Sequence, residues 1–574
     1  MSTFGRKTHS ATRGGQTVLK ALTWAIPLLF LVIFFYQPMA AIIRLVFAEQ
    51  FSGGWQLINA GDILRPLEFT FSQAALSTLL TLLLGIPAAY LFSHYKFAGK
   101  NLLNLVSTLP FILPTVVVAA GFNALLGPRG LLNLGLMGLF ELNEAPIRFV
   151  NSIGAILVVH VFYNITIVIR IVSNAMASLD QRLAQAAKTL GATPMKVLTE
   201  ITLPLLTPAV LSATLLVFLF DFTSFGVILL MGGPGMNTIE VAIYKQVFFN
   251  LNLPLAGLLS IVQLVITFGV TILYNRVTHR NPAGRLQHIE PITPVAPKTR
   301  GAKAAIFVLV VLLLLFIVSP MAALVGRSFS QLEPARGEGG DFRAGISLAY
   351  YRELFSNRQD SLFYVPPLLA IKNSLVYALA TIGITLPLGF LLAYALNQKG
   401  RWGNWVEPVI MLPLGASAVT LGLGLLVVFY TQNSLFQTLP LLVPIAHSLI
   451  ALPFVVRILM PALGKIPGSL RDAARSLGAS PRQVIREIDM PLLFRSAVAS
   501  AIFAFTISVG EFGASSFIAS PTNPTIPVAI YRYISQPGGL NYGQALAMSS
   551  ILLVTCLLGV MLIEKTRIPG EEVF

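Results

Sequence analysis

Charged residues and cysteine are both scarce in this chain. Only 11% of its 574 residues are Asp, Glu, Lys or Arg, whereas ordinary soluble domains carry about 25%, and 55% are hydrophobic. The single cysteine, Cys556, lies in an apolar run and has no second cysteine with which to form an internal disulfide or a thiolate metal site. The composition excludes an ordinary soluble protein and predicts a chain whose surface faces mostly lipid.

Phosphate-binding and catalytic motifs are absent as well. No segment has the G-x-x-x-x-G-K-[ST] pattern of a nucleotide-binding loop, because Gly464-Lys465 is followed by Ile466 and lacks the earlier glycine. Metalloprotease, hydrolase-elbow and Cys/His zinc spacings are missing too. We therefore expect no catalytic residue, no metal and no bound cofactor in this chain.

Long apolar stretches are what the sequence has in abundance. A helix needs about 20 apolar residues to cross the hydrocarbon core of a bilayer. Twelve stretches approach or exceed that length, and they predict an all-α polytopic membrane protein with about 12 transmembrane helices. The stretches are Val18–Phe47, Thr70–Phe92, Leu103–Leu126, Val150–Val172, Thr207–Met231, Leu253–Tyr274, Ala304–Val325, Asn373–Leu396, Trp405–Phe429, Leu441–Leu459, Ala497–Ile518 and Ala545–Ile563.

The net charge of +16 follows the predicted topology. With the N-terminus in the cytoplasm, most Lys and Arg fall in the inner segments, and this bias predicts that both termini are cytoplasmic. The basic charge therefore gives no support to nucleic-acid binding and fits a multi-pass protein of the inner or plasma membrane. The basic N-terminus followed by an apolar run also resembles a cleaved signal peptide, but the run is longer than a signal core and we expect it to be retained.

The chain contains an internal repeat. The segment from Leu183 to Leu206 matches the segment from Leu470 to Leu493 at 13 of 24 positions without a gap, at an offset of 287 residues. The same offset pairs His160 with His447. A gapless register of this length predicts a tandem duplication.

Each half of the repeat holds six predicted spans, so both halves enter the membrane with the same orientation. Upstream the offset is 304, and the difference falls in the longer loop after the third span of the first half. The repeat is therefore parallel, with an axis along the membrane normal. We expect a first half over residues 1–275, a cytoplasmic linker over 276–302 and a second half over 303–574.

The most similar segments of the two halves are loops between the fourth and fifth spans, at 178–206 and 465–493. Lipid packing does not constrain a cytoplasmic loop, so a partner protein is the expected constraint. In the first loop, Leu183–Leu190 is predicted to be a short helix that Gly191 caps at positive φ. Pro194 suits the first turn of a second helix, and Pro204 is expected to end that helix before the fifth span. Two alanines on the first helix, Ala186-Ala187, would let another protein approach closely.

This spacing resembles the EAA motif of binding-protein-dependent ABC importer permeases of type I. The motif residues in the two loops are Gln185, Ala186, Ala187, Gly191, Ile201 and Pro204, and Asp472, Ala473, Ala474, Gly478, Ile488 and Pro491. The Glu of the motif is replaced by Gln185 and Asp472, and Leu203 of the first copy is matched by Met490, which leaves the docking role intact but makes the two loops chemically unequal.

The resemblance implies the partners and the mechanism. Each loop would supply a coupling helix that docks on one of two copies of a separate ATP-binding subunit, which uses ATP and Mg²⁺, and an extracytoplasmic solute-binding protein would deliver the solute. A secondary transporter driven by an ion gradient would also show a 12-span parallel repeat, but it would not need duplicated docking helices. A membrane scaffold or receptor that transports nothing is the other alternative.

Two carboxylates lie inside the fifth spans. Asp221 and Glu511 are candidates for the solute pathway, since ionisable residues in spans are costly to bury; the alternative is a buried carboxylate bonded to neighbouring helices. They are not register partners, because Asp221 aligns with Ser508 and Glu511 with Ser224. The surrounding GEFG also resembles oxyanion permeases. We expect the histidines at 160 and 447 to pack between helices.

The solute is only weakly indicated. A single chain with two permease halves resembles the ferric-iron and thiamine importers, and Thr238–Tyr244 with its second copy, Thr525–Tyr531, is similar to a segment of those systems. We expect ferric iron first and thiamine second, followed by an oxyanion or a phosphonate.

Overall fold

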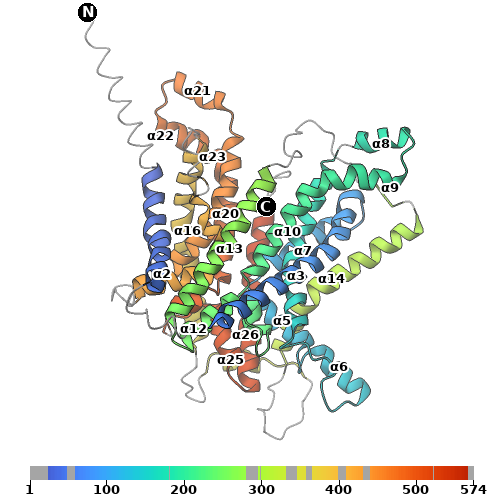
Figure 1. Ribbon diagram of the computed structural model, residues 1–574, viewed down its shortest axis with the longest axis vertical. Coiled ribbons are helices and arrows are strands. Elements are labelled where there is room, and N and C mark those ends of the chain that lie inside the picture. The colour runs from blue at the N-terminus through green and yellow to red at the C-terminus, as the bar shows by residue number, and fades with distance from the viewer. Residues whose placement is uncertain are drawn as a thin grey trace, which may run out of the picture. The chain divides into compact units, whose positions relative to one another are not determined.

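A computed structural model describes residues 23–47, 59–179, 181–279, 295–297, 299–330, 345–356, 365–397, 407, 409–430, 440–520 and 522–566. Within these residues the chain is helical, with isolated β-bridges in place of a sheet (Figure 1). The helices, where η marks π or 3₁₀ geometry, are η1 (Val32–Tyr36), α2 (Gln37–Phe47), α3 (Ala60–His94), α4 (Lys100–Ile112), α5 (Thr115–Leu126), α6 (Leu131–Phe140), α7 (Ile153–Ala177), α8 (Gln181–Thr189), α9 (Pro194–Val197), η3 (Leu198–Thr202), α10 (Leu203–Phe222), α11 (Gly226–Met231), α12 (Ile239–Phe248), α13 (Leu253–His279), α14 (Arg300–Ser328), α15 (Ala349–Glu353), α16 (Pro367–Asn397), η5 (Leu412–Gly415), α18 (Ala418–Leu425), η6 (Leu426–Tyr430), α20 (Leu442–Gly464), α21 (Gly468–Ser476), α22 (Pro481–Val484), η7 (Ile485–Asp489), α23 (Met490–Gly510), α24 (Ser515–Ile518), α25 (Ile526–Ser535) and α26 (Gly539–Thr566).

The predicted all-α membrane fold is confirmed. Among the described residues, 11 helical segments are long and apolar enough to cross a membrane, and a shorter apolar helix, Ala418–Phe429, lies where the ninth span was expected. The predicted ninth span begins at Trp405, outside the described residues, and 431–439 are also outside them. The count of 12 is therefore met by 11 long segments and one short one.

The third predicted span, Leu103–Leu126, is wrong as a single helix. The structure divides it into α4 and α5 at Leu113, which adopts an extended conformation before Pro114. Proline disfavours the helical region for the residue that precedes it, and it has no N–H to continue the hydrogen-bond pattern. The long apolar segment here is Thr115–Phe140, which combines α5 and α6.

The fifth predicted span of each half also breaks. In the first half α10 ends at Phe222 and α11 starts at Gly226, and in the second half α23 ends at Gly510 and α24 starts at Ser515. Irregular backbone at membrane depth is tolerated only where protein buries it or where it lines a polar cavity. The two breaks therefore mark positions where neighbouring helices must satisfy free backbone groups.

The second and fourth spans pack in the same way in both halves. A Cβ on Gly85 of α3 would lie 2.6 Å from Val168 Cγ1 of α7, and a Cβ on Gly389 of α16 would lie 2.5 Å from Val455 Cγ1 of α20. Both glycines permit close contact between helix axes at equivalent positions of the repeat.

The chain forms two compact units, each of which takes the first span of the other half of the sequence. One unit consists of 48–364 with 530–553, and the other of 1–47, 365–529 and 554–574. Thus α2 belongs with α16 to α24, and α14 belongs with α3 to α13. The domain boundaries predicted from the repeat describe the duplication and stay a prediction, because the compact units follow contacts rather than sequence halves.

Glycine permits the close approach of each exchanged span. A Cβ on Gly121 of α5 would lie 2.8 Å from Met321 Cε and 2.9 Å from the Pro320 carbonyl oxygen of α14. A Cβ on Gly424 of α18 would lie 2.9 Å from Pro38 Cβ and 3.1 Å from Met39 Cε. In both units, therefore, a Pro-Met pair of the exchanged first span packs on a glycine of the third span.

Candidate functional site: paired loops and paired buried clusters

The loops between the fourth and fifth spans have the predicted bent shape. In one unit α8 and α9 lie at the end opposite α6 (Figure 1). Gly191 follows α8 at φ +87°, and its N–H donates to the Lys188 carbonyl while Ala192 N–H donates to the Ala187 carbonyl at 2.9 Å. These two bonds form a Schellman motif, which satisfies carbonyls at the end of the helix. The predicted glycine cap is confirmed.

The second loop repeats this geometry. Gly478 follows α21 at φ +87°, and Ala479 N–H donates to the Ala474 carbonyl. The leucine just before each glycine, Leu190 or Leu477, is 89% exposed. The two loops therefore share an exposed apolar side chain at the end of the first helix.

The prediction that Pro204 ends the loop helix is wrong, because the helix is continuous from Met195 to Phe222. Both loops lead into the fifth span through a π-helical turn. Leu203 N–H donates to the Leu198 carbonyl five residues earlier, and Met490 N–H donates to the Ile485 carbonyl. A proline follows each of these residues directly and cannot donate an N–H, so the helix widens by one residue at this point. The motif isoleucines, Ile201 and Ile488, lie inside the two π turns.

One ion pair distinguishes the loops. Arg471 Nε of α21 lies 2.8 Å from Asp489 Oδ1 of η7, and Asp489 is fully buried. The register partners in the first loop are Ala184 and Thr202, which cannot form this pair. The second loop is therefore tied to the start of its fifth span by a charged bond that the first loop lacks.

A buried polar cluster lies at the break in the fifth span of the first half. His160 of α7 is 2% exposed, its Nε2 lies 2.8 Å from Ser224 Oγ, and its Nδ1 lies 3.5 Å from Asp221 Oδ1. Asn164 donates to the same carboxylate oxygen at 2.6 Å, and the Gln73 amide donates to the Asp221 backbone carbonyl at 2.9 Å. Three spans, α3, α7 and α10, therefore meet at Asp221.

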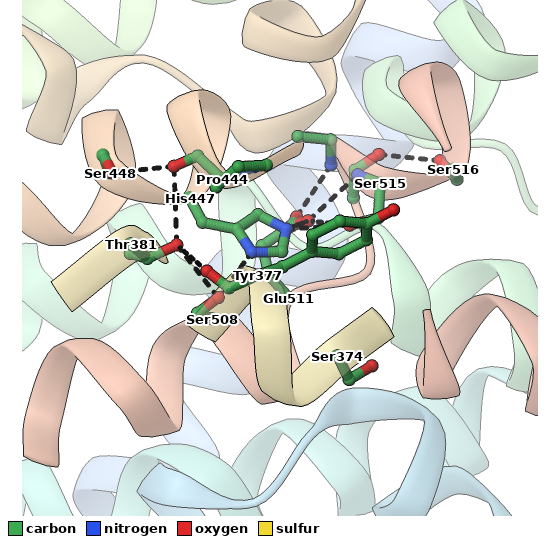
Figure 2. A network of polar contacts seen from close by, with 12 residues as sticks. Ser374, Tyr377, Thr381, Pro444, His447, Ser448, Ser508, Glu511, Ser515 and Ser516 are labelled. Carbon is green, nitrogen blue, oxygen red and sulfur yellow. Dashed lines mark hydrogen bonds and ion pairs between the residues drawn. The ribbon is translucent and has the colours of Figure 1, made fainter. Parts of the chain in front are cut away.

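The second half has a matching cluster around His447 of α20 (Figure 2). His447 Nδ1 lies 2.7 Å from Ser508 Oγ, and Nε2 lies 2.9 Å from Ser515 Oγ and 3.2 Å from Glu511 Oε2. The Glu511 carboxylate also accepts the Ser515 N–H and hydroxyl and the Ala514 N–H. Thr381 of α16 contacts Ser508 at 3.2 Å.

The two candidate pathway carboxylates are both buried in this conformation. Asp221 is 1% exposed and Glu511 is 8% exposed, and each is held against a histidine. The expectation that His160 and His447 pack between helices is confirmed. The pathway role of the carboxylates stays a prediction. Among the described residues, no group of three or more His, Cys, Asp or Glu side chains could hold a metal ion.

The two copies of the sequence VAIY, Val241–Tyr244 and Val528–Tyr531, lie in α12 and α25. Ile239 N–H of α12 donates to Thr70 Oγ1 at 3.0 Å, and Ile526 N–H of α25 donates to Ser374 Oγ at 2.9 Å, so both helices are fixed to the second span at equivalent positions. Burial raises the pKa of Tyr244 above its ordinary value, and the hydrogen-bonded Tyr531 hydroxyl adds to the effect. Tyr244 and Tyr531, the last residues of the two copies, are therefore in contact with each other.

Comparison with known proteins places these features in a family. The model for a binding-protein-dependent transport system inner membrane component matches twice, at residues 81–281 and 385–565. The thiamine transport system permease protein ThiP of Brucella abortus is 25% identical over 556 residues, covering 94% of this chain and 97% of its own length. ThiP of Escherichia coli K12 is 25% identical over 538 residues, covering 90% of this chain and 91% of its own length.

A shorter relative matches part of the chain. The putative 2-aminoethylphosphonate transport system permease protein PhnU of Salmonella paratyphi A is 26% identical over 271 residues, which are 46% of this chain and 93% of that protein. The two family matches correspond to the two halves of the repeat and together span more than half of the chain. The chain therefore belongs to the family of binding-protein-dependent transport system inner membrane components, as a multi-pass membrane permease with two family domains fused in one polypeptide.

Proposed function

We propose that this permease imports thiamine, driven by two copies of a separate ATP-binding subunit and supplied by an extracytoplasmic solute-binding protein. The name of the relatives that match along 90% or more of this chain supports thiamine. Ferric iron, which the sequence alone placed first, is not supported as the leading solute. Thiamine takes its place, and a phosphonate is the next choice because of the shorter relative.

The observation that carries the coupling mechanism is the duplicated loop. Two exposed helices with identical Schellman caps, identical exposure of the terminal leucine and equivalent π turns stand in front of the two fifth spans. Two loops with the same backbone geometry fit two copies of one ATP-binding subunit, although the loops differ in side chains. ATP binding to the two partner subunits would draw the loops together, and each loop would move the spans on either side of it. This arrangement requires the loops and both termini to be cytoplasmic.

Uptake of labelled thiamine into proteoliposomes tests this function. The vesicles contain this permease with its ATP-binding subunits, and the solute-binding protein is added outside. We expect accumulation that requires ATP and that excess unlabelled thiamine abolishes. Accumulation in vesicles that contain this chain alone and no nucleotide would identify a secondary transporter instead. Competition by 2-aminoethylphosphonate or ferric iron, without competition by thiamine, would overturn the choice of solute.

A second experiment addresses the loops. Ala186→Trp and Ala473→Trp place a bulky side chain on the exposed face of α8 and α21, and we expect both the co-purified ATP-binding subunit and uptake to be lost. Leu139→Trp in α6 is the matched control, because Leu139 is 74% exposed and α6 lies at the end of its unit opposite α8 (Figure 1). If the ATP-binding subunit co-purified normally with the Ala186→Trp/Ala473→Trp double variant, α8 and α21 would not be its docking helices.

A further inference from the structure

The two buried clusters are built from the same positions of the repeat. His160 corresponds to His447 at the offset of 287, and Ser77 of α3 corresponds to Thr381 of α16 at the offset of 304. The residues on the fifth span correspond as well, since Asp221 aligns with Ser508 and Ser224 with Glu511. Each half therefore has one carboxylate and one serine at these two positions, in opposite order.

The structure shows that the exchange preserves the surroundings of the histidine. In the first half Nδ1 faces the carboxylate of Asp221 and Nε2 faces the hydroxyl of Ser224. In the second half Nδ1 faces the hydroxyl of Ser508 and Nε2 faces the carboxylate of Glu511. In each half one ring nitrogen faces a carboxylate and the other faces a hydroxyl, with the two sides reversed. The His160 Nδ1 contact with Asp221 is a 3.5 Å ion-pair contact without a hydrogen bond, and His447 Nε2 also lies 2.9 Å from the Ser515 hydroxyl.

The side chains that donate hydrogen bonds to the carboxylate also differ between the two halves. Asn164, which donates to Asp221, is replaced in the second half by Ala451, where the carboxylate is absent. Ser515, which donates its N–H and hydroxyl to Glu511, is replaced in the first half by Ile228. Asn164 and Ser515 therefore occur only in the half whose carboxylate they bond, whereas the hydroxyl on the second span, Ser77 or Thr381, is present in both halves.

Burial of a carboxylate inside a membrane protein is unfavourable unless bonds compensate it. Among the ion pairs of the described residues, Asp221 and Glu511 each pair with a histidine and not with Lys or Arg. A pair of hydroxyls would hold the histidine at lower desolvation cost. The presence of one carboxylate in each half, at different register positions, is not explained by packing alone.

The position of the clusters in the fold indicates which elements they connect. Each coupling loop joins the fourth span to the fifth, and these two spans pack along one another. His160 lies 17 residues before Ala177, the last residue of α7, which corresponds to about 25 Å along the helix. Asp221 lies at the end of α10. The loop joins the fourth and fifth spans at one end of the pair. The histidine connects them at the other end, where the fifth span breaks.

We infer that the carboxylate beside the buried histidine of each half is a positioning residue. It fixes the break in the fifth span to the fourth span, so that movement of the coupling loop is transmitted to the break. The two carboxylate positions are interchangeable, provided that the donors move with the charge. The inference rests on the proposed function, because its effect is on coupled transport.

Exchange variants test the inference. Asp221→Ser leaves the first half with two hydroxyls, and we expect the uptake rate to fall by roughly tenfold or more while the ATP-binding subunits still co-purify. The triple variant Asp221→Ser/Ser224→Glu/Ile228→Ser installs the arrangement of the second half, and we expect uptake to return to within roughly threefold of the parent. The mirror series is Glu511→Ser alone and Glu511→Ser/Ser508→Asp/Ala451→Asn.

A control variant and a coupling measurement separate positioning from folding. Ser224→Glu/Ile228→Ser with Asp221 retained places two carboxylates on one histidine, and their repulsion should make this variant worse than the triple one. The ratio of ATP hydrolysed to solute transported should rise in Asp221→Ser and return in the triple variant. A purely structural role would change the amount of folded protein and leave that ratio constant.

Three outcomes would overturn the inference. They are normal uptake in Asp221→Ser, a constant coupling ratio throughout the series, and failure of both triple variants to recover although they accumulate normally in the membrane. If Asp221→Ser does not accumulate, Asp221→Asn with and without the Ser224→Glu/Ile228→Ser changes replaces it. Absence of thiamine uptake in the parent would count against the proposed function only, because the ATP-dependent change in hydrogen exchange at the break, 223–225, should still be lost in Asp221→Ser and return in the triple variant.

Discussion

The bent shape of the two loops depends on the backbone conformation of Gly191 and Gly478. Both have φ of +87°, and a Cβ at either position would meet no atom within 4 Å, so the cost of a side chain is conformational. We expect Gly191→Ala to destabilise the loop by about 1–2 kcal/mol, because L-residues are strained at positive φ. Asn should be tolerated better, since it visits this region more readily. Hydrogen exchange of α8 and co-purification of the ATP-binding subunit measure the effect.

Gly269 provides the matched control for that substitution. It lies inside α13, a Cβ there would also meet nothing within 4 Å, and its φ is not positive. Gly269→Ala should leave loop exchange unchanged and stabilise the helix by about 0.5–1 kcal/mol. Equal loss of loop protection in Gly191→Ala and Gly269→Ala would show that the Schellman geometry is not what holds the loop.

The loop residues were predictable from sequence and the histidine clusters only partly. A glycine between two short helices has a local cause, and both caps occur where the sequence placed them. The alignment also showed that Asp221 and Glu511 are not register partners. It could not show that one histidine stands between the two positions in each half, because that contact joins spans separated by more than 50 residues.

At the scale of the element, the Arg471–Asp489 pair connects the helix of the second loop to the start of the fifth span. Asp489 is fully buried and Arg471 is mostly so, whereas the neighbouring Arg475–Asp472 pair is exposed. Arg471→Ala leaves a buried carboxylate without its partner, and we expect a loss of about 3 kcal/mol or somewhat less, given the partial exposure of the arginine. Arg475→Ala should cost under about 1 kcal/mol, as for a surface pair.

Thermal unfolding of the purified permease compares these two variants, with exchange of α21 as the local measurement. The register substitution Ala184→Arg/Thr202→Asp in the first loop completes the set, since it would supply the missing pair and protect α8. Equal midpoints for Arg471→Ala and Arg475→Ala would show that the buried pair does not stabilise the loop.

Breaks within helices were the main failure of prediction at this scale. Hydropathy measures how apolar a stretch is and does not detect a change of backbone geometry inside it. Pro114 gave a local signal that the third span ends early, and Pro204 and Pro491 marked the π turns. The break after Gly510 has no proline, and its free groups are met by Glu511, which only the folded arrangement reveals.

The exchange of first spans is a property of the whole molecule, and it was not predictable from the repeat. Alignment of two halves shows which residues correspond, but it does not show which half a span packs against. The glycines that receive the exchanged spans, Gly121 and Gly424, are ordinary residues of apolar stretches in the sequence. Their role follows only from the contact with a Pro-Met pair more than 190 residues away.

This exchange predicts how the chain behaves when it is cut. Separation between Gln287 and His288, in the predicted linker, gives two fragments that each lack the first span of one compact unit. We expect either fragment expressed alone to be degraded, and both expressed together to co-purify and restore ATP-dependent uptake, because each supplies the span that the other needs.

Substitution at the glycines separates this explanation from simple affinity between two similar halves. Gly424→Leu should abolish co-purification of the fragments, since a side chain there would collide with Pro38, whereas Gly383→Leu in α16, where a Cβ would meet no atom within 4 Å, should leave it unchanged. Stable, separately folded fragments, or fragments that assemble equally well with Gly424→Leu, would show that the exchanged spans do not hold the two halves together.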